Sequence, residues 1–240
     1  RLQPELRVTP TAQGRAVFVA SHTESVHMAP LLFTDLGTIL AWEGLDLDLV
    51  PYGKVLAATD LEDASMVVVL PVHDYPSALS DVTIYDEAWT APEIQVLVDY
   101  VEAGGLLVLT NSRHRLGPFG RPVENNEDWG DLNALAGAFG VVYSGSYTGR
   151  EASVSPGHDL VQGVTSLFMI DGNGVGLTFE GQDYESLASA GGAPVAAVAN
   201  VGDNGGEVVA LQDVEDLQHR DALAVRGQLP DLVAVGARRG

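Results

Sequence analysis

The segment from Thr90 to Thr110 constrains the fold more than any other part of the sequence. Thr90 and Glu93 have the spacing of a capping box, in which two residues flanking the first helical turn bond to each other's backbone N–H groups. Gly104 and Gly105 then end the predicted helix. Residues 106–110 follow as a largely apolar run, which is typical of a strand buried on both faces. A helix that leads so directly into a buried strand predicts one crossover of a parallel sheet.

The same alternation of helix and strand extends along the chain. Apolar runs predict strands at 16–20, 45–50 and 66–72, and an apolar stripe at helical spacing predicts a helix over 30–43. Residues 145–190 are Gly-rich and carry weaker strand signals. Residues 194–201 and 207–211 flank a Gly-rich turn and predict a β-hairpin. The expected fold class is α/β, with a flavodoxin-like, doubly wound, mostly parallel sheet, helices on both faces and a C-terminal β-hairpin.

The length of the chain suits one large domain with a core of its own, because 240 residues bury a sizeable apolar interior. We expect an N-terminal extension over residues 1–14, one domain over 15–217, and a tail or linker over 218–240. The sequence begins at Arg1 rather than Met, which is typical of a processed chain or an excised fragment. This beginning favours an extracytoplasmic or secreted protein without fixing its compartment.

Composition excludes several classes of function. Twelve basic residues stand against 33 acidic ones, and the formal net charge of -21 repels phosphate backbones and anionic lipid. We therefore expect no binding to nucleic acid. We also expect no insertion into a membrane, because no apolar run approaches the roughly 18 to 20 residues that span a bilayer. The absence of cysteine excludes disulfides, thiolate zinc sites and a cysteine nucleophile. The partners that remain are another protein or a small ligand, with carbohydrate a candidate because Trp89 and Trp129 border long polar segments.

Five segments of the sequence resemble the class I glutamine amidotransferase-like superfamily. The strongest is the helix-to-strand segment from Thr90 to Leu109, and three more agree with it in order: Val17–Ser21, Ala64–Leu70 and Gly206–Asp213. His158–Val164 resembles a His-Pro-x-x-x-Gly-Val motif that is common in the superfamily, with Asp159 in place of the proline. Relatives there include ThuA-like proteins and domains associated with gliding-motility and ABC-transport systems. The resemblance implies the fold over roughly residues 15–217.

The resemblance does not extend to the catalytic cysteine. In active amidotransferases the strand corresponding to 106–110 leads into a tight turn, flanked by glycines, that carries the nucleophile. Here the next residues are Asn111, Ser112, Arg113 and His114. Ser112 is the one hydroxyl that could replace the thiol, but it lacks the small neighbours that a strained nucleophile turn requires. The resemblance therefore implies a degenerate member without the family's chemistry.

Polar residues follow the first and third predicted strands, which are neighbours in a flavodoxin-like sheet. Ligands bind beyond the carboxyl ends of such strands, and imidazoles with carboxylates suit either a divalent metal or acid–base chemistry. The simplest alternative is that polar residues follow strands because strands end at solvent. The candidates are His22, Glu24, His73 and Ser112 for catalysis, His22, His27 and His73 for a metal, and Asp74, Asn111, Arg113 and His114 for a ligand.

Two functions are consistent with these patterns. The first is a non-catalytic, amidotransferase-like binding or assembly module of a larger or exported system. The alternative is a hydrolase, with or without a divalent metal, that uses the His/Glu crevice beyond the first and third strands. Convergence of at least three of these side chains within metal-ligand distance of one point favours an enzyme or a ligand site, whereas a large apolar or aromatic surface patch favours the module.

Overall fold

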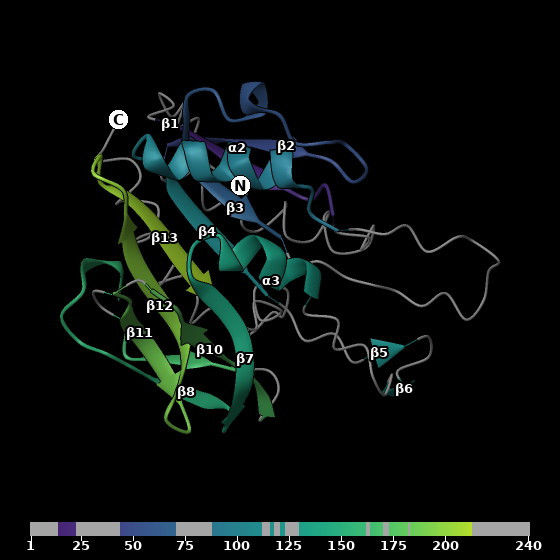
Figure 1. Cartoon of the computed structure of the whole chain (residues 1–240). Coiled ribbons are helices and arrows are strands. Elements are labelled where there is room, and N and C mark those ends of the chain that lie inside the picture. Colours follow the sequence, from purple (N-terminus) through teal and green to yellow (C-terminus); the bar gives the residue numbers. More distant parts are fainter. Residues whose placement is uncertain are drawn as a thin grey trace, which may run out of the picture.

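A nine-stranded sheet forms the body of the protein (Figure 1). The computed structural model describes residues 14–22, 44–70, 88–111, 116–117, 121–122, 130–161, 164–169, 173–181 and 183–212. Within these residues the strand order is β2-β1-β3-β4-β13-β12-β11-β8-β9. The sheet has a parallel half and an antiparallel half, which meet at β13.

The parallel half has the predicted flavodoxin-like order. Its strands are β2 (Leu45–Val50), β1 (Gly14–Val19), β3 (Ala64–Val69), β4 (Leu106–Thr110) and β13 (Gly206–Leu211). Each pairs in parallel with its neighbour. Most of their side chains are buried, as the continuous apolar runs predicted, because elements pack on both faces of a parallel sheet. The α/β, flavodoxin-like fold class is confirmed.

The antiparallel half extends the sheet beyond β13. It consists of β12 (Ala193–Val201), β11 (Glu185–Ala190), β8 (Glu151–Val154) and β9 (Ser166–Phe168). Each of these strands pairs in antiparallel with its neighbours. The predicted C-terminal hairpin is confirmed as β12–β13, which closes at the pair Val201 and Gly206.

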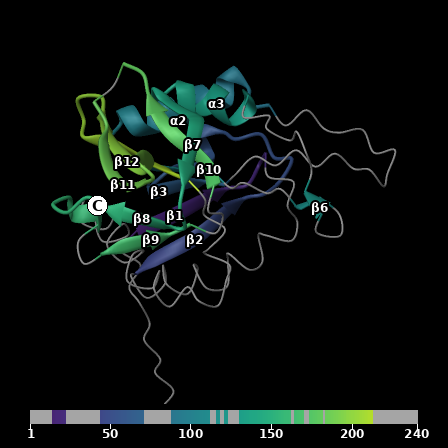
Figure 2. The ribbon, with the colours of Figure 1, turned by 90° about the horizontal axis from the view of Figure 1, so that it is seen from below.

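Both described α-helices lie on one face of the sheet. They are α2 (Ala91–Glu102) and α3 (Gly130–Gly137). The two-stranded ribbon of β7 (Val141–Thr148) and β10 (Asn173–Phe179) lies on the same side, as Figure 2 shows. Side chains from all four elements and from the sheet form one buried cluster. The predicted helix at 30–43 lies outside the described residues.

A second core cluster occupies the opposite face. Phe18, Met66 and Val108 come from the parallel strands, and Leu187 comes from β11. Leu160 of the short helix η3 (Asp159–Val161) packs on the same cluster. Among the described helices, none is long and apolar enough to cross a membrane. The remaining short elements are η1 (Ala58–Asp60) and the paired strands β5 (Leu116–Gly117) and β6 (Arg121–Pro122).

Helix α2 ends as the paired glycines predicted. Gly104 has a φ of 104°, and its N–H donates to the carbonyl of Val101 at 2.8 Å. The N–H of Gly105 donates to the carbonyl of Tyr100 at 3.0 Å, which completes a Schellman motif. The end of the helix then lies directly on the start of β13, because a Cβ on Gly206 would overlap the carbonyl oxygen of Val101. Only glycine permits this approach of helix to strand.

Replacing Gly206 with alanine should therefore destabilise the protein. We expect Gly206→Ala to lower the free energy of unfolding by about 3 kcal/mol, because backbone must move to admit the methyl group. Gly137→Ala is the matched control, since its Cβ meets no atom within 4 Å and alanine favours helix. Urea unfolding measures both variants. Equal stability of the two would contradict the packing described for Gly206.

Candidate functional site

The carboxyl ends of β1 and β3 lie at the same edge of the sheet, as predicted, because these strands are parallel neighbours. Of the candidate residues, His22 and Asn111 are described. The roles assigned to the others stay predictions, because these residues lie outside the described part of the chain: Glu24, His27, His73, Asp74, Ser112, Arg113 and His114.

His22 is held by a buried carboxylate. Its Nε2 lies 3.1 Å from Oε1 of Glu93, the third residue of α2. The imidazole also packs against the indole of Trp89, with ring centroids 4.2 Å apart and planes tilted by 40°. The His22 side chain is 14% exposed. Strand β1 is thereby joined to the start of α2 through side chains.

The Glu93 carboxylate accepts hydrogen bonds at both oxygens. Besides the contact with His22, Oε1 accepts the backbone N–H of Leu56 at 3.0 Å. Oε2 accepts the N–H of Thr90 at 3.2 Å and the Thr90 hydroxyl at 2.7 Å. The residue is 1% exposed. The capping residue predicted from sequence is thus also the centre of a buried network, a role that the Thr-x-x-Glu spacing alone does not reveal.

These donors keep Glu93 ionised. Burial by itself would raise the pKa of the carboxyl group, but hydrogen bonds from Leu56, Thr90 and His22 lower that pKa below its ordinary value. An ionised carboxylate orients the imidazole of His22, which is one requirement for a general base. However, the same carboxylate also stabilises the start of α2. Its first role in this arrangement is structural.

Removing the charge of Glu93 should weaken the fold and change its acid sensitivity. We expect Glu93→Gln to lower the free energy of unfolding by about 2 kcal/mol at neutral pH, because charge-assisted hydrogen bonds are lost. The pKa of Glu93 is lower in the folded state, so its stabilisation is complete above the ordinary value of 4.5 and is lost as pH falls through the folded pKa. The free energy of unfolding of Glu93→Gln should therefore change less with pH in this acidic range than that of the parent protein.

The exposed Glu102, at the other end of α2, supplies the control. Glu102→Gln should leave both the stability and its dependence on acid within about 0.5 kcal/mol of the parent protein. Urea unfolding at a series of pH values measures all three proteins. An acid profile for Glu93→Gln that matches the parent's would contradict the network.

Asn111 occupies the position after β4 where the resemblance places a nucleophile turn. Its Nδ2 donates to Oε1 of Gln212 at 2.9 Å, and Gln212 directly follows the neighbouring strand β13. Asn111 is 1% exposed and Gln212 is 5% exposed. The backbone N–H of Asn111 donates to the carbonyl of Leu211 at 3.1 Å, which extends the hydrogen bonds between β4 and β13 by one residue. The first residue after β4, where the resemblance places the nucleophile turn, therefore belongs to a buried pair of side-chain amides.

Further bonds fix the same edge of the sheet. The Thr110 hydroxyl donates to the carbonyl of Val69 at 2.7 Å, which joins β4 to β3. The Tyr143 hydroxyl of β7 donates to the carbonyl of Leu109 at 3.1 Å. Burial and the nearby Tyr184 raise the pKa of Tyr143, so its hydroxyl stays protonated. The described polar groups at this edge thus serve to hold strands together.

The amide pair can be tested by a double-mutant cycle. We expect Asn111→Ala and Gln212→Ala each to lower the free energy of unfolding by about 1–3 kcal/mol, since each leaves buried polar surroundings unsatisfied. The double variant should cost less than the sum, with a coupling of about 1 kcal/mol. Chemical denaturation of the four proteins gives the coupling. Strict additivity would show that the amides do not interact.

Within the described residues no group of three or more His, Asp or Glu side chains is arranged to hold a metal ion. Because His22 directs Nε2 to Glu93, a metal at His22 would have to use the other ring nitrogen or displace this contact. His27 and His73 lie outside the described residues. The divalent-metal hypothesis stays a prediction.

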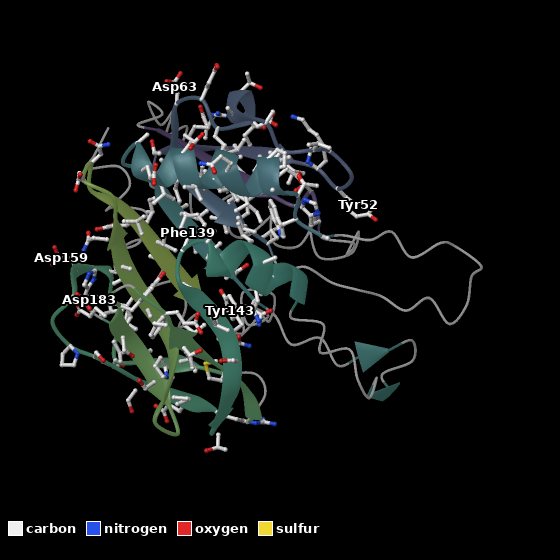
Figure 3. The ribbon with its side chains drawn as sticks, in the orientation of Figure 1. Tyr52, Asp63, Phe139, Tyr143, Asp159 and Asp183 are labelled. Carbon is white, nitrogen blue, oxygen red and sulfur yellow. The ribbon has the colours of Figure 1, made fainter. Side chains whose placement is uncertain are left out.

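An exposed apolar loop follows β2, and sequence reasoning did not identify it. Val55 is 68% exposed and Tyr52 is 42% exposed, and Figure 3 shows Tyr52 at the rim of the molecule. The loop is nevertheless anchored on both sides: the N–H of Gly53 donates to the carbonyl of Ser21 at 3.0 Å, and Leu56 is bound to Glu93. We call Tyr52–Val55 the exposed loop.

No family model matches the chain, and no curated protein matches its sequence. Solved structures do match its fold. The mmIFT52 N-terminal domain aligns with 94% of this chain and 98% of its own, at 13% identity and a TM-score of 0.63. A ThuA-like protein from Bacteroides uniformis aligns over 99% and 94%, at 14% identity and a TM-score of 0.51.

A third match is a GMP synthase-like protein from Thermoplasma acidophilum. It aligns with 94% of this chain and 96% of its own, at 12% identity and a TM-score of 0.54. Identities this low show similarity of fold alone. The chain therefore shares its flavodoxin-like α/β fold with ThuA-like and GMP synthase-like proteins, which is consistent with a glutamine amidotransferase-like fold.

Proposed function

We propose that this chain is a non-catalytic, amidotransferase-like binding or assembly module of a larger or exported system. One observation carries the proposal: the residue that follows β4 is Asn111, whose buried amide is bound to Gln212. An active amidotransferase needs a cysteine nucleophile beyond this strand, and the sequence contains no cysteine. The edge that would carry chemistry in a relative is used here to join two strands.

Other features of the same edge support the proposal. Glu93 and Thr110 use their polar atoms to connect β1, β3, β4 and α2, which favours a structural role for them. The likeness to an N-terminal domain over nearly the whole chain suits a unit that works within a longer protein. The large net charge suits a partner protein better than nucleic acid or membrane.

The exposed loop is the surface that we assign to partner binding. Tyr52 offers exposed aromatic contact area, which is enriched at protein interfaces, and Val55 adds exposed apolar area beside it. The bonds to Ser21 and Glu93 hold the loop in place before a partner arrives. A loop that is already ordered loses little conformational entropy on binding, so its contacts contribute more fully to affinity.

A paired-variant capture experiment tests this assignment. The parent protein and a Tyr52→Ser/Val55→Ser variant are each tagged, cross-linked in an extract of the source cells, and their captured proteins quantified by mass spectrometry. We expect the amount of a specific partner captured by the loop variant to be about tenfold or more lower than the amount captured by the parent, the loss typical of an interface hot spot. An Asp183→Ser/Glu185→Ser variant, altered at exposed positions far along the sheet, should capture as much as the parent. Equal capture by all three proteins would contradict the assignment.

The alternative function is a hydrolase at the carboxyl ends of β1 and β3. The contact between His22 and Glu93 favours it, because a carboxylate that orients an imidazole also supports acid–base catalysis. In this alternative Glu24, His73 and Ser112 supply the remaining groups, with or without a divalent metal at His22, His27 and His73. Asp74, Arg113 and His114 then bind the substrate.

Hydrolysis of L-glutamine and of p-nitrophenyl acetate separates the two functions. The module predicts no turnover by the parent protein above that of the His22→Ala variant. The hydrolase predicts turnover that His22→Ala lowers by about a hundredfold or more, the contribution of a general base. Elemental analysis of protein purified without added metal tests the metal independently.

A further inference from the structure

The turn of the β12–β13 hairpin contains an asparagine followed by a glycine. Asn204 and Gly205 are both exposed, and they lie in the turn 202–205 that leads from β12 to β13. An asparagine in this setting is chemically labile, because the next backbone nitrogen can attack its side-chain carbonyl carbon. A following glycine favours that attack, since it has no Cβ to obstruct the approach and its backbone adopts a wide range of conformations.

Two other asparagines are held more firmly. The sequence contains a second Asn-Gly pair, Asn173–Gly174, but this asparagine begins β10 and is paired with Thr148 across the ribbon. Asn200 is exposed, but it lies within β12 and precedes the β-branched Val201, whose side chain is stiff and crowds the backbone. A strand restricts the backbone rotation that the attack requires. Asn204 lies in a turn, where no strand pairing imposes this restriction.

In the folded protein the turn lies against the C-terminal end of α2. Nδ2 of Asn204 donates to the carbonyl of Glu102 at 2.7 Å. The two backbones are also close, since a Cβ on Gly104 would lie 3.0 Å from the carbonyl oxygen of Asn204. The side chain is thus held by its amide nitrogen, which is the group that the reaction expels. Exposed turns open locally far more often than a whole protein unfolds, and such openings release this restraint.

We propose that Asn204 is a site of spontaneous deamidation and that its hydrogen bond to Glu102 sets the rate. When the turn leaves α2, the backbone nitrogen of Gly205 attacks Cγ of Asn204. A bond forms between that nitrogen and Cγ, the bond between Cγ and Nδ2 breaks, and Nδ2 leaves as ammonia with the proton that the attacking nitrogen gives up. Water then opens the resulting succinimide ring at either carbonyl, which yields aspartate or isoaspartate. The site is independent of partner binding by the exposed loop.

The product binds α2 less well than asparagine does. A carboxylate has no N–H to donate to Glu102, and its negative charge lies beside the carbonyls at the C-terminal end of a helix, where the helix dipole repels it. The turn connects β12 to β13, and β13 joins the parallel half of the sheet to the antiparallel half. Deamidation at this turn therefore loosens the junction between the two halves.

Peptide mapping by mass spectrometry tests the site. The full chain is incubated at mildly alkaline pH, in one sample folded and in another unfolded by urea. In the folded chain we expect Asn204 to be converted at least about tenfold faster than Asn200, because of the glycine that follows it. Conversion of folded Asn204 should be about fivefold slower than in urea, the effect of one neutral hydrogen bond. Equal conversion of Asn204 and Asn200 would overturn the site, and equal rates with and without urea would overturn the role of Glu102.

Two variants test the consequence for the hairpin. Asn204→Ala removes the donor alone, whereas Asn204→Asp removes it and adds the charge of the product. Hydrogen exchange of the Glu207 amide, which donates to the carbonyl of Gly105 at 3.1 Å, reports opening at this end of the hairpin. We expect this exchange to be about threefold faster in Asn204→Asp than in Asn204→Ala at low salt, and the difference to shrink at high salt. Equal exchange in the two variants at low salt would contradict the repulsion by α2.

Discussion

The buried carboxylate of Glu93 is the interaction on which the arrangement of the described carboxyl edge depends. Three pieces of chain meet at its two oxygens: the end of β1 through His22, the loop after β2 through Leu56, and the start of α2 through Thr90. A buried charge is stable only when donors surround it, so each piece must be in place for the others to be favourable. Because the donors come from segments far apart in the sequence, one side chain couples the ordering of a helix, a strand end and a loop.

Hydrogen bonds between strand ends add to this coupling at the carboxyl edge of the sheet. In the parallel half, polar groups at the strand ends form bonds between strands, with Asn111 bound to Gln212 and Thr110 bound to the backbone of β3. Such bonds make this edge of the sheet rigid. Rigidity of this kind suits recognition, because a surface whose shape is fixed beforehand loses little entropy when it binds.

The sequence predicted what depends on local physics. The capping box at Thr90, the paired glycines after α2 and the apolar runs of the parallel strands each correspond to an observed element, because each signal arises within a few residues. Strands β8, β9 and β11 were harder to predict, since their small and polar residues give little periodicity and their pairing is set by distant strands. His22 was identified as a candidate, but its contact with Glu93 was not, because a capping glutamate is ordinarily exposed at the start of its helix. Gln212 was missed because it meets Asn111 across 101 positions of sequence.

The position of β13 has a consequence for how the protein is made. This strand lies between β4 and β12, yet it is the last strand of the described chain to leave the ribosome. Until residues 206–211 emerge, the parallel and antiparallel halves cannot join, and β4 and β12 each present an unsatisfied edge. Unpaired apolar edges are sites of aggregation during synthesis. The nascent chain is therefore expected to need protection, by a chaperone or by rapid translation, over the long interval between β4, which ends at Thr110, and β13, which begins at Gly206.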